Sequence, residues 1–357
     1  MADRWRQGAT LEPAPVAGRR ARLPTASLGH LRRLTNQVGV WEHAEFDRPR
    51  PEHGFCTDDN ARALVVACRH GTGPGVTAIA TTTLRFVLDA RDRQGRLRNR
   101  RRADGVWLEQ HRSDDAEGRA VWALGTAARL APEAAQRRDA GDAFARLAPL
   151  GSTHLRPHAT AALGAAEVLA LEPNHAVARR LITDAAARIA VAAQQASPWI
   201  EPRLTYDDAR LPEALLAAGA TLHDRDLLDL GLERLWWLAE EQTCEERFSF
   251  TPVGGRAPGG ARPAFDQQPL DAAAMAEACA RAWSLTGDPL WRGLAERAAR
   301  WLLGCNDTRA VLYDRATGGT FDGLTADGAN LNRGAESTIA GVAALQAAAS
   351  CRVPAGR

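Results

Sequence analysis

The stretch Thr57-Asp58-Asp59-Asn60-Ala61-Arg62-Ala63-Leu64 places two adjacent aspartates directly before a run of small and apolar residues. Acidic residues in front of such a run are typical of the first turn of a helix. Similar polar motifs open other Ala/Leu-rich runs at intervals of about forty to seventy residues, namely Asp114-Asp115, His154-x-x-x-His158, Asp207-Asp208, Asp266 and Glu336. Each interval is long enough for two helices and their loops.

Six such motifs predict six helical hairpins closed into an all-α (α/α)6 barrel. The runs at 114–130, 154–171 and 334–350 are apolar on nearly all sides, which is typical of buried inner helices. The runs at 174–195, 224–242 and 289–304 alternate apolar and charged faces, as outer helices do. The remaining expected helices are 25–37, 58–70, 76–91, 134–148, 207–220 and 267–286, and we expect 25–37 to pair with 334–350 and close the ring.

The boundaries of the barrel follow from composition. Residues 1–23 are rich in Arg, Pro, Gly and Ala and are expected to form a flexible N-terminal tail. Residues 24–350 are expected to form the single barrel domain, and 351–357 a C-terminal tail. The arginine-rich stretch 91–112 is expected to be a solvated loop or small hairpin, with phosphate binding as the alternative.

Composition excludes several classes of function. The chain has 357 residues, a net charge of +2 and no lysine, so Schiff-base chemistry, attachment of pyridoxal phosphate and a P-loop lysine are excluded. A charge so close to neutral gives no general attraction to nucleic acid or to an anionic membrane. The six cysteines form no Cys-x-x-Cys pair and predict reduced, mostly buried thiols in a cytoplasmic protein. We expect no signal peptide and no membrane span.

The carboxylates are the strongest candidates for chemistry. Inner helices of such a barrel run parallel, so their N-termini meet at one face, where backbone N–H groups stabilise a carboxylate as an anion. We predict that Glu336, Asp59 and Asp207 are the catalytic groups, with Asp58 and Asp208 assisting them and binding substrate. Ordinary helix capping is the alternative for each motif taken alone.

Other polar and aromatic residues are candidates for substrate binding. Trp107 and Trp199 each precede an aspartate pair, and flat aromatic faces stack on sugar rings; the alternative is that they fill gaps between hairpins. Two glutamines at a helix entry are suited to hydroxyl groups. Arg210 could bind an acidic group or form an internal salt bridge. The full set of predicted binding residues adds Asp115, His158, Asp266, Gln267, Gln268 and Asn332 to these and to Asp58 and Asp208.

A metal site is not expected. His154 and His158 have the i, i+4 spacing of helical metal ligands, but spacing suggests no third ligand. Hydrogen bonding to substrate or a structural role therefore fits them better, and no cofactor is expected.

Several motifs together resemble bacterial proteins of the six-hairpin glycosidase-like superfamily, many of which are described as glycosyltransferases or glycosyltransferase-associated proteins. The resemblance covers residues 25–350 and rests on Phe55–Leu64, Asp115–Gly125, Leu204–Ala214, Phe265–Leu270 and Gly334–Thr338. It implies an (α/α)6 barrel and carbohydrate metabolism. The chain carries no Gly-rich nucleotide loop, so we do not expect it to bind a sugar nucleotide.

The expected function is cleavage of a glycosidic bond in an oligosaccharide or glycan, by hydrolysis or phosphorolysis, with a carboxylate pair at the mouth of the barrel. One alternative is a sugar epimerase or isomerase on the same barrel, with His154 or His158 as the proton shuttle. Another is a non-catalytic glycan-binding protein that partners a glycosyltransferase. Neither a nucleic acid nor a membrane is expected as a partner.

Overall fold

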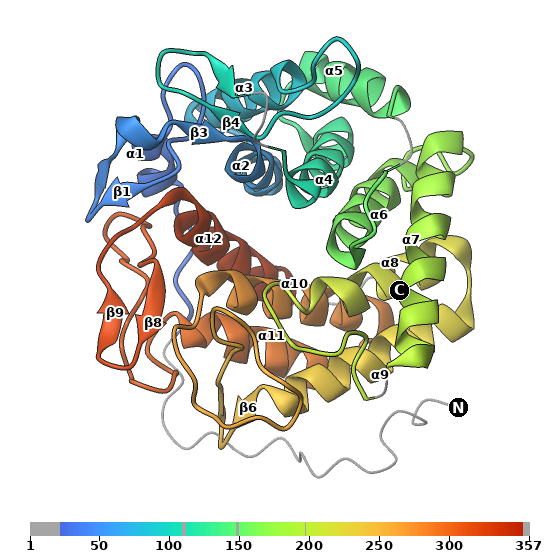
Figure 1. Cartoon of the computed structure of the whole chain (residues 1–357), viewed down its shortest axis with the longest axis vertical. Helices are drawn as coiled ribbons and strands as arrows, with labels where there is room; N and C mark the ends of the chain where they lie inside the picture. Colours follow the sequence, from blue (N-terminus) through green and yellow to red (C-terminus); the bar gives the residue numbers. More distant parts are fainter. Residues whose placement is uncertain (1–21, 109–111, 148–149, 197, 353–357) are drawn as a thin grey trace.

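Two concentric rings of helices make up the protein (Figure 1). The structure is a computed structural model that describes residues 22–108, 112–147, 150–196 and 198–352. The inner ring consists of α2 (Thr57–Arg69), α4 (Asp114–Leu130), α6 (Leu155–Leu169), α8 (Arg210–Leu222), α10 (Pro269–Thr286) and α12 (Ala335–Ser350). The outer ring consists of α1 (Gly29–Leu34), α3 (Pro74–Asp89), α5 (Ala134–Ala145), α7 (Ala176–Gln195), α9 (Arg225–Glu241) and α11 (Pro289–Trp301).

Contacts between helices close the ring. Each inner helix packs against the next inner helix, and α12 packs against α2. Each outer helix packs against its inner neighbour, and α1 pairs with α12. The predicted all-α (α/α)6 barrel, including the closure by its first and last helices, is therefore confirmed.

Glycines allow the closest approach between inner helices. A methyl group on Gly125 of α4 would overlap the carbonyl oxygen of Gly164 in α6, and one on Gly118 would overlap that of Pro157. Only a residue without a side chain fits where two backbones approach so closely. The small residues that the sequence concentrates in these runs thus bring α4 and α6 together.

In the described part of the chain, four small antiparallel sheets lie in the loops. The predicted loop or hairpin at 91–112 contributes two strands to one of them. The pairings are β1 (Ala44–Glu45) with β2 (Arg48–Pro49); β3 (Phe55–Cys56) with β4 (Arg100–Arg101), which also pairs with β5 (Trp107–Leu108); β6 (Thr243–Cys244) with β7 (Arg247–Phe248); and β8 (Gly323–Thr325) with β9 (Gly328–Asn330). A 3-10 turn, η2 (Pro51–His53), precedes β3.

Several predicted helix boundaries are wrong. The helices expected to end at 148 and 304 end at Ala145 and Trp301, and two other helices differ for reasons that the backbone shows. The helix expected at 25–37 covers only Gly29–Leu34, because Thr35 adopts an extended conformation and forms a β-bridge with Val40. The helix expected at 207–220 starts at Arg210, because Asp207 has a positive φ in the left-handed region. A right-handed helix cannot contain such a residue.

The predicted tails lie mostly outside the described residues. Where they are described, Leu23 and Cys351 are buried, so the packed structure extends slightly beyond 24–350. Cys56, Cys68, Cys279 and Cys351 are buried free thiols, Cys244 is partly buried and Cys305 is exposed. Among the described residues, none of the helices combines the length and apolar character that a bilayer crossing requires.

Candidate active site

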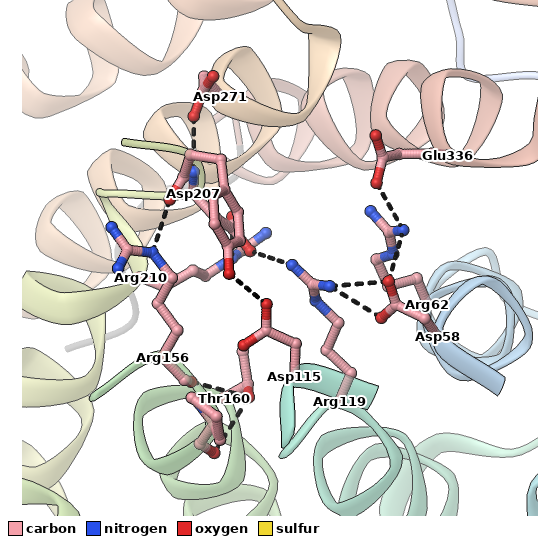
Figure 2. A network of polar contacts seen from close by, with 12 residues as sticks. Asp58, Arg62, Asp115, Arg119, Arg156, Thr160, Asp207, Arg210, Asp271 and Glu336 are labelled. Atoms are coloured by element: carbon pink, nitrogen blue, oxygen red, sulfur yellow. Dashed lines mark hydrogen bonds and ion pairs between the residues drawn. The ribbon is translucent and has the colours of Figure 1, made fainter. Parts of the chain in front are cut away.

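Charged side chains from several inner helices meet at the end of the barrel where these helices begin (Figure 2). Glu336 lies in the first turn of α12, and its carboxylate accepts a hydrogen bond of 2.8 Å from Nη2 of Arg62 on α2. The same nitrogen donates to Asp59 at 2.8 Å and to Asp58 at 3.1 Å. One guanidinium group therefore joins three of the predicted carboxylates.

Arg119 of α4 continues the network. Its Nη1 donates to both oxygens of Asp58 at 2.8 Å, and its Nη2 donates to Asp207 at 3.0 Å. Asp58, Asp59, Asp207 and Glu336 thus belong to one connected chain of ion pairs, although they come from three distant parts of the sequence. The predicted gathering of acidic side chains at one end of the barrel is observed.

The carboxylates of this network differ in their surroundings. Burial raises the pKa of Asp59 to about 7. The negative charges of Asp58 and Glu336 also raise this pKa, whereas the positive charge of Arg62 lowers it. Burial also acts on Asp58, but Arg119 and Arg62 hold its pKa below the usual range. Neighbouring carboxylates thus have opposite proton affinities, which is the environment that general acid and base groups require.

Cys56 fixes the start of α2. As the N-cap, its Sγ accepts a hydrogen bond of 3.4 Å from the backbone N–H of Asp59 and donates one of 3.1 Å to the carboxylate of the same residue. Burial raises the pKa of this thiol well above its usual range, so it remains a proton donor. Asp59 is therefore held on both sides, by a thiol and by Arg62.

The turn before α8 positions the next aspartate pair. The left-handed Asp207 donates its backbone N–H to Asp271 at 2.7 Å. Although burial opposes the effect, Arg210 and Arg119 keep the pKa of Asp207 low. Asp208 accepts from the backbone N–H of Thr205 at 3.1 Å and from Arg156 at 2.8 Å, which stabilises the turn. The two aspartates therefore have separate roles, one in the network and one in the turn.

Deeper in the barrel, the chain of ion pairs continues to residues that no small molecule at the mouth can touch. Arg210, predicted to bind substrate, is buried and contacts Asp207, Glu213 and Glu277. Its guanidinium lies 4.7 Å from the ring centre of Trp122. The alternative interpretation of Arg210, an internal salt bridge, therefore describes the contacts of this residue.

The two predicted sugar-stacking tryptophans pack within the protein. Trp199 is 1% exposed and stacks on Trp237 with ring centres 5.4 Å apart. Trp107 lies against Phe86 on one side, and the guanidinium of Arg98 covers its ring at 4.7 Å. Arg101 also lies over the Trp107 ring, at 5.3 Å, so three side chains pack against this residue, and Trp199 is fully buried. Gap filling therefore describes the contacts of both tryptophans better than stacking on a sugar.

Other predicted binding residues have structural partners outside the network. His158 is buried and its Nε2 lies 2.9 Å from the carbonyl oxygen of Ser152. Gln267 is fully buried and donates to Asp307 at 2.8 Å. Gln268 occupies the N-cap position of α10 without a capping hydrogen bond from its side chain, and Asp266, two residues earlier, is exposed. Asn332 accepts the backbone N–H of Phe46 at 2.9 Å.

Asp115 belongs to a second group at the mouth. Its carboxylate accepts a hydrogen bond from the hydroxyl group of Tyr206, the residue before Asp207. The ring of Tyr206 lies 4.9 Å from the guanidinium of Arg156, whose Nε donates to the Tyr206 carbonyl at 2.7 Å. Tyr206, which contacts Asp115, and Asp207, which belongs to the ion-pair chain, are adjacent in the sequence. These two residues therefore link Asp115 to the ion-pair chain.

Oxygens of Asp58, Asp59 and Glu336 lie within 4.8 Å of one another, a spacing that a metal ion could use. Nη2 of Arg62, however, is within hydrogen-bond distance of all three. The guanidinium already supplies the positive charge at this position, so the donor set fits a metal poorly.

The prediction missed the arginines. Arg62 follows Asp58 by four residues, and Arg119 follows Asp115 by four, so an Asp-x-x-x-Arg pattern recurs in α2 and α4. Residues four apart share one face of a helix, which points both side chains toward the same end of the barrel. This repeat was the signal that could have identified them.

No protein-family model and no curated protein sequence matches the chain. Several solved structures do. A cellobiose 2-epimerase from Spirochaeta thermophila is 13% identical, with a TM-score of 0.67 over 92% of this chain and 94% of that one. A sugar epimerase from a ruminal bacterium is 12% identical, with a TM-score of 0.70 over 90% and 96%. An α-1,6-mannanase from Salegentibacter sp. is 12% identical, with a TM-score of 0.60 over 90% and 98%.

These likenesses extend over almost the whole of each chain, while the identities are too low to carry more than architecture. The protein therefore shares the (α/α)6 barrel fold of these structures, with an arginine–carboxylate network at the end where its inner helices begin.

Proposed function

We propose that this protein is a carbohydrate-active enzyme whose active site lies at the N-terminal end of the inner ring, with Glu336 as the catalytic acid or base. One observation carries the proposal: the Glu336 side chain is 38% exposed, whereas those of Asp59 and Asp207 are 4% and 3% exposed. Glu336 is thus the nominated catalytic carboxylate that a substrate can reach. The names of the similar structures, two epimerases and a mannanase, support a sugar as that substrate.

The first candidate reaction is cleavage of a glycosidic bond. Glu336 would exchange a proton with the bridging oxygen or with the attacking water or phosphate. Asp59 and Asp207 lie behind Arg62 and Arg119, so we propose that they act by holding these guanidinium groups rather than by straddling the scissile bond. In particular, Arg62 fills the space between Asp59 and Glu336.

The second candidate reaction is epimerisation or isomerisation of a reducing sugar. His43, beside the β1–β2 hairpin, supports it because its side chain is 49% exposed and it lies close enough to the mouth carboxylates to respond to their charge. Burial lowers the pKa of His43, while Asp322 and Glu336 raise it. An imidazole and a carboxylate on the two sides of a sugar could remove and return a proton. His43 thereby replaces His154 and His158 as the proposed histidine.

Product analysis in D2O separates these reactions. Cellobiose and α-1,6-mannobiose would be incubated with the protein, with and without phosphate, and followed by NMR. Cleavage releases a monosaccharide, or a sugar phosphate when phosphate is the acceptor. Epimerisation leaves a disaccharide with deuterium at C2 of the reducing sugar, whereas isomerisation to a ketose leaves a disaccharide with deuterium at C1.

Glu336→Gln tests the assignment of the catalytic group. The amide cannot exchange a proton, so we expect the rate to fall by about 10²- to 10⁴-fold. Glu233→Gln is the matched control, because Glu233 lies on the outer helix α9 with its side chain 56% exposed. Turnover by Glu336→Gln at the rate of this control would reject the proposal.

A further inference from the structure

Tyr206 is an exposed aromatic residue that is held rigidly at the edge of the network. We propose that its ring is the stacking platform for a sugar and that Asp115 binds the hydroxyl groups of that sugar, opposite Glu336. This inference rests on the proposed function and names its binding subsite. It also replaces Trp107 and Trp199, which pack within the protein.

Three contacts hold Tyr206 in place. Its hydroxyl group donates to Asp115, its carbonyl oxygen accepts from Arg156, and the Arg156 guanidinium lies over its ring at 4.9 Å. Asp207, the next residue, has a positive φ in the left-handed region. Such a conformation is unfavourable for a residue with a side chain and occurs often at ligand-binding sites. The direction of the Tyr206 ring is therefore fixed before any ligand arrives.

Despite these contacts, 39% of Tyr206 is exposed. Removing an aromatic ring from water lowers the free energy. A ring that is held rigidly in contact with water is therefore unfavourable in the unliganded protein. The arrangement becomes favourable when an apolar surface covers the ring. The C–H groups on one face of a pyranose supply such a surface, and a preorganised ring loses little entropy on binding.

Asp115 determines which sugar chemistry fits. Within the described part of the chain, no arginine lies at ion-pair distance from its carboxylate, in contrast to Asp58 and Asp207. Its free acceptor positions can therefore receive hydrogen bonds from sugar hydroxyl groups. Arg62 and Arg119 already form ion pairs with Glu336, Asp58 and Asp207, so the acidic Asp115 would repel an anionic sugar on Tyr206. The geometry therefore favours a neutral pyranoside.

Figure 2 shows Asp115 on one side of Arg119 and Glu336 on the other, with Asp58 and Arg62 between Arg119 and Glu336. A sugar lying on Tyr206 would accordingly extend toward Glu336 across the ion-paired arginines. Asp115 on α4 and Glu336 on α12 thus flank α2, which carries Asp58 and Arg62.

The chain has only two tyrosines, which makes a direct test possible. Protein labelled with ring-¹³C tyrosine should give two sets of signals, and Tyr206→Phe removes and thereby assigns one of them. We expect cellobiose or α-1,6-mannobiose to shift the Tyr206 signals and to leave those of Tyr313, which is 2% exposed, unchanged. If saturating amounts of both sugars leave Tyr206 unshifted, the inference is wrong.

Variants measure the contribution of the ring. Tyr206→Ala should weaken binding of the same disaccharide by about 3- to 10-fold, the usual size of an aromatic contact. Tyr206→Phe retains the ring and should bind more tightly than Tyr206→Ala. Tyr313→Phe is the control for loss of a hydroxyl group elsewhere, and thermal unfolding of each variant checks that it is folded. Equal affinities of the alanine and phenylalanine variants would contradict a stacking role.

The outcomes also separate this inference from the proposed function. Turnover that depends on Glu336 without a response of Tyr206 would reject the subsite alone. A Tyr206 shift with cellobiose or α-1,6-mannobiose but no turnover of either would support the subsite and count against the proposed catalytic activity. Binding by Glu336→Gln with the wild-type shift of Tyr206 is the result expected if both are correct.

Discussion

The inner and outer rings use the same charged residue types in different ways. In the inner ring, Arg119 is 5% exposed and joins Asp58 to Asp207, which lie 61 and 88 residues away. On the outer helices, Arg225–Asp229 is an exposed pair and Arg292–Glu296 joins an exposed arginine to a partly buried glutamate, each within one helical turn. Arg119 thus links α4 to α2 and to the turn before α8, while each of these two outer pairs stays within one helix.

This difference implies different energetic roles. An exposed pair contributes little because water screens it, whereas removal of one partner from a buried pair leaves an uncompensated charge in the interior. The inner network therefore makes the mouth of the barrel sensitive to the position of each inner helix. Four substitutions test this comparison, in order of expected effect.

Arg119→Met should have the largest effect. It leaves Asp58 and Asp207 without their shared cation, so we expect a loss of about 3–5 kcal/mol in the free energy of unfolding, measured by urea denaturation. Adding Asp58→Asn and Asp207→Asn removes the uncompensated charges and should restore part of this loss. A decrease below about 1 kcal/mol would show that Arg119 is not a structural centre of the mouth.

Gly125→Ala tests the close packing that positions these charges. The added methyl group would meet the Gly164 carbonyl oxygen. We therefore expect a destabilisation of about 1–3 kcal/mol. Gly293→Ala on the outer helix α11 is the matched control, because its added methyl group meets no atom within 4 Å. It should stabilise by about 0.5–1 kcal/mol through helix propensity. If Gly125→Ala and Gly293→Ala changed the free energy of unfolding equally in thermal and urea denaturation, close packing would not distinguish the inner ring from the outer ring.

Asp208 provides a test by pH. Burial raises its pKa to about 7, against the effect of Arg156. The folded state thus holds the proton more tightly than the unfolded state, so the stabilisation is present at low pH and is lost as the pH rises toward 7 and above. Each such group lowers the free energy of unfolding by about 1 kcal/mol per pH unit between about pH 4 and 7. Asp208→Asn should make urea unfolding less dependent on pH in this interval, and an unchanged slope would contradict the shift.

Arg292→Ala should have the smallest effect. Its Nε lies 3.3 Å from the carboxylate of its partner Glu296, and the arginine side chain is 48% exposed. Because water screens such a pair, we expect the free energy of unfolding to change by at most about 0.5 kcal/mol. The same urea measurement serves as the baseline for Arg119→Met. A loss comparable to that of Arg119→Met would mean that the location of an ion pair in the inner or outer ring does not determine its contribution to the free energy of unfolding.

The barrel could be predicted from the sequence because its signal repeats. Polar motifs before apolar runs gave the number of hairpins, and the distribution of charge separated inner from outer helices. The short helix α1 and the late start of α8 were missed because both depend on single backbone conformations, at Thr35 and Asp207, that composition does not reveal.

The candidate site was predicted in part. The convergence of Asp58, Asp59, Asp207 and Glu336 followed from parallel inner helices. The role of the tryptophans could not be decided from the sequence, because their residue type suits both a sugar and a core, and only packing distinguishes the two. Which acid is exposed and which is covered by an arginine depends on contacts between distant helices, which spacing along the chain cannot provide.

The pairing of α1 with α12 has a consequence for biosynthesis. The ring closes through residues near the two ends of the chain, so the first helices cannot complete their packing until α12 has left the ribosome. During elongation, the inner face of α2 has no final partner and presents apolar surface. A nascent chain of this topology is therefore expected to depend on chaperones until its last hairpin is synthesised.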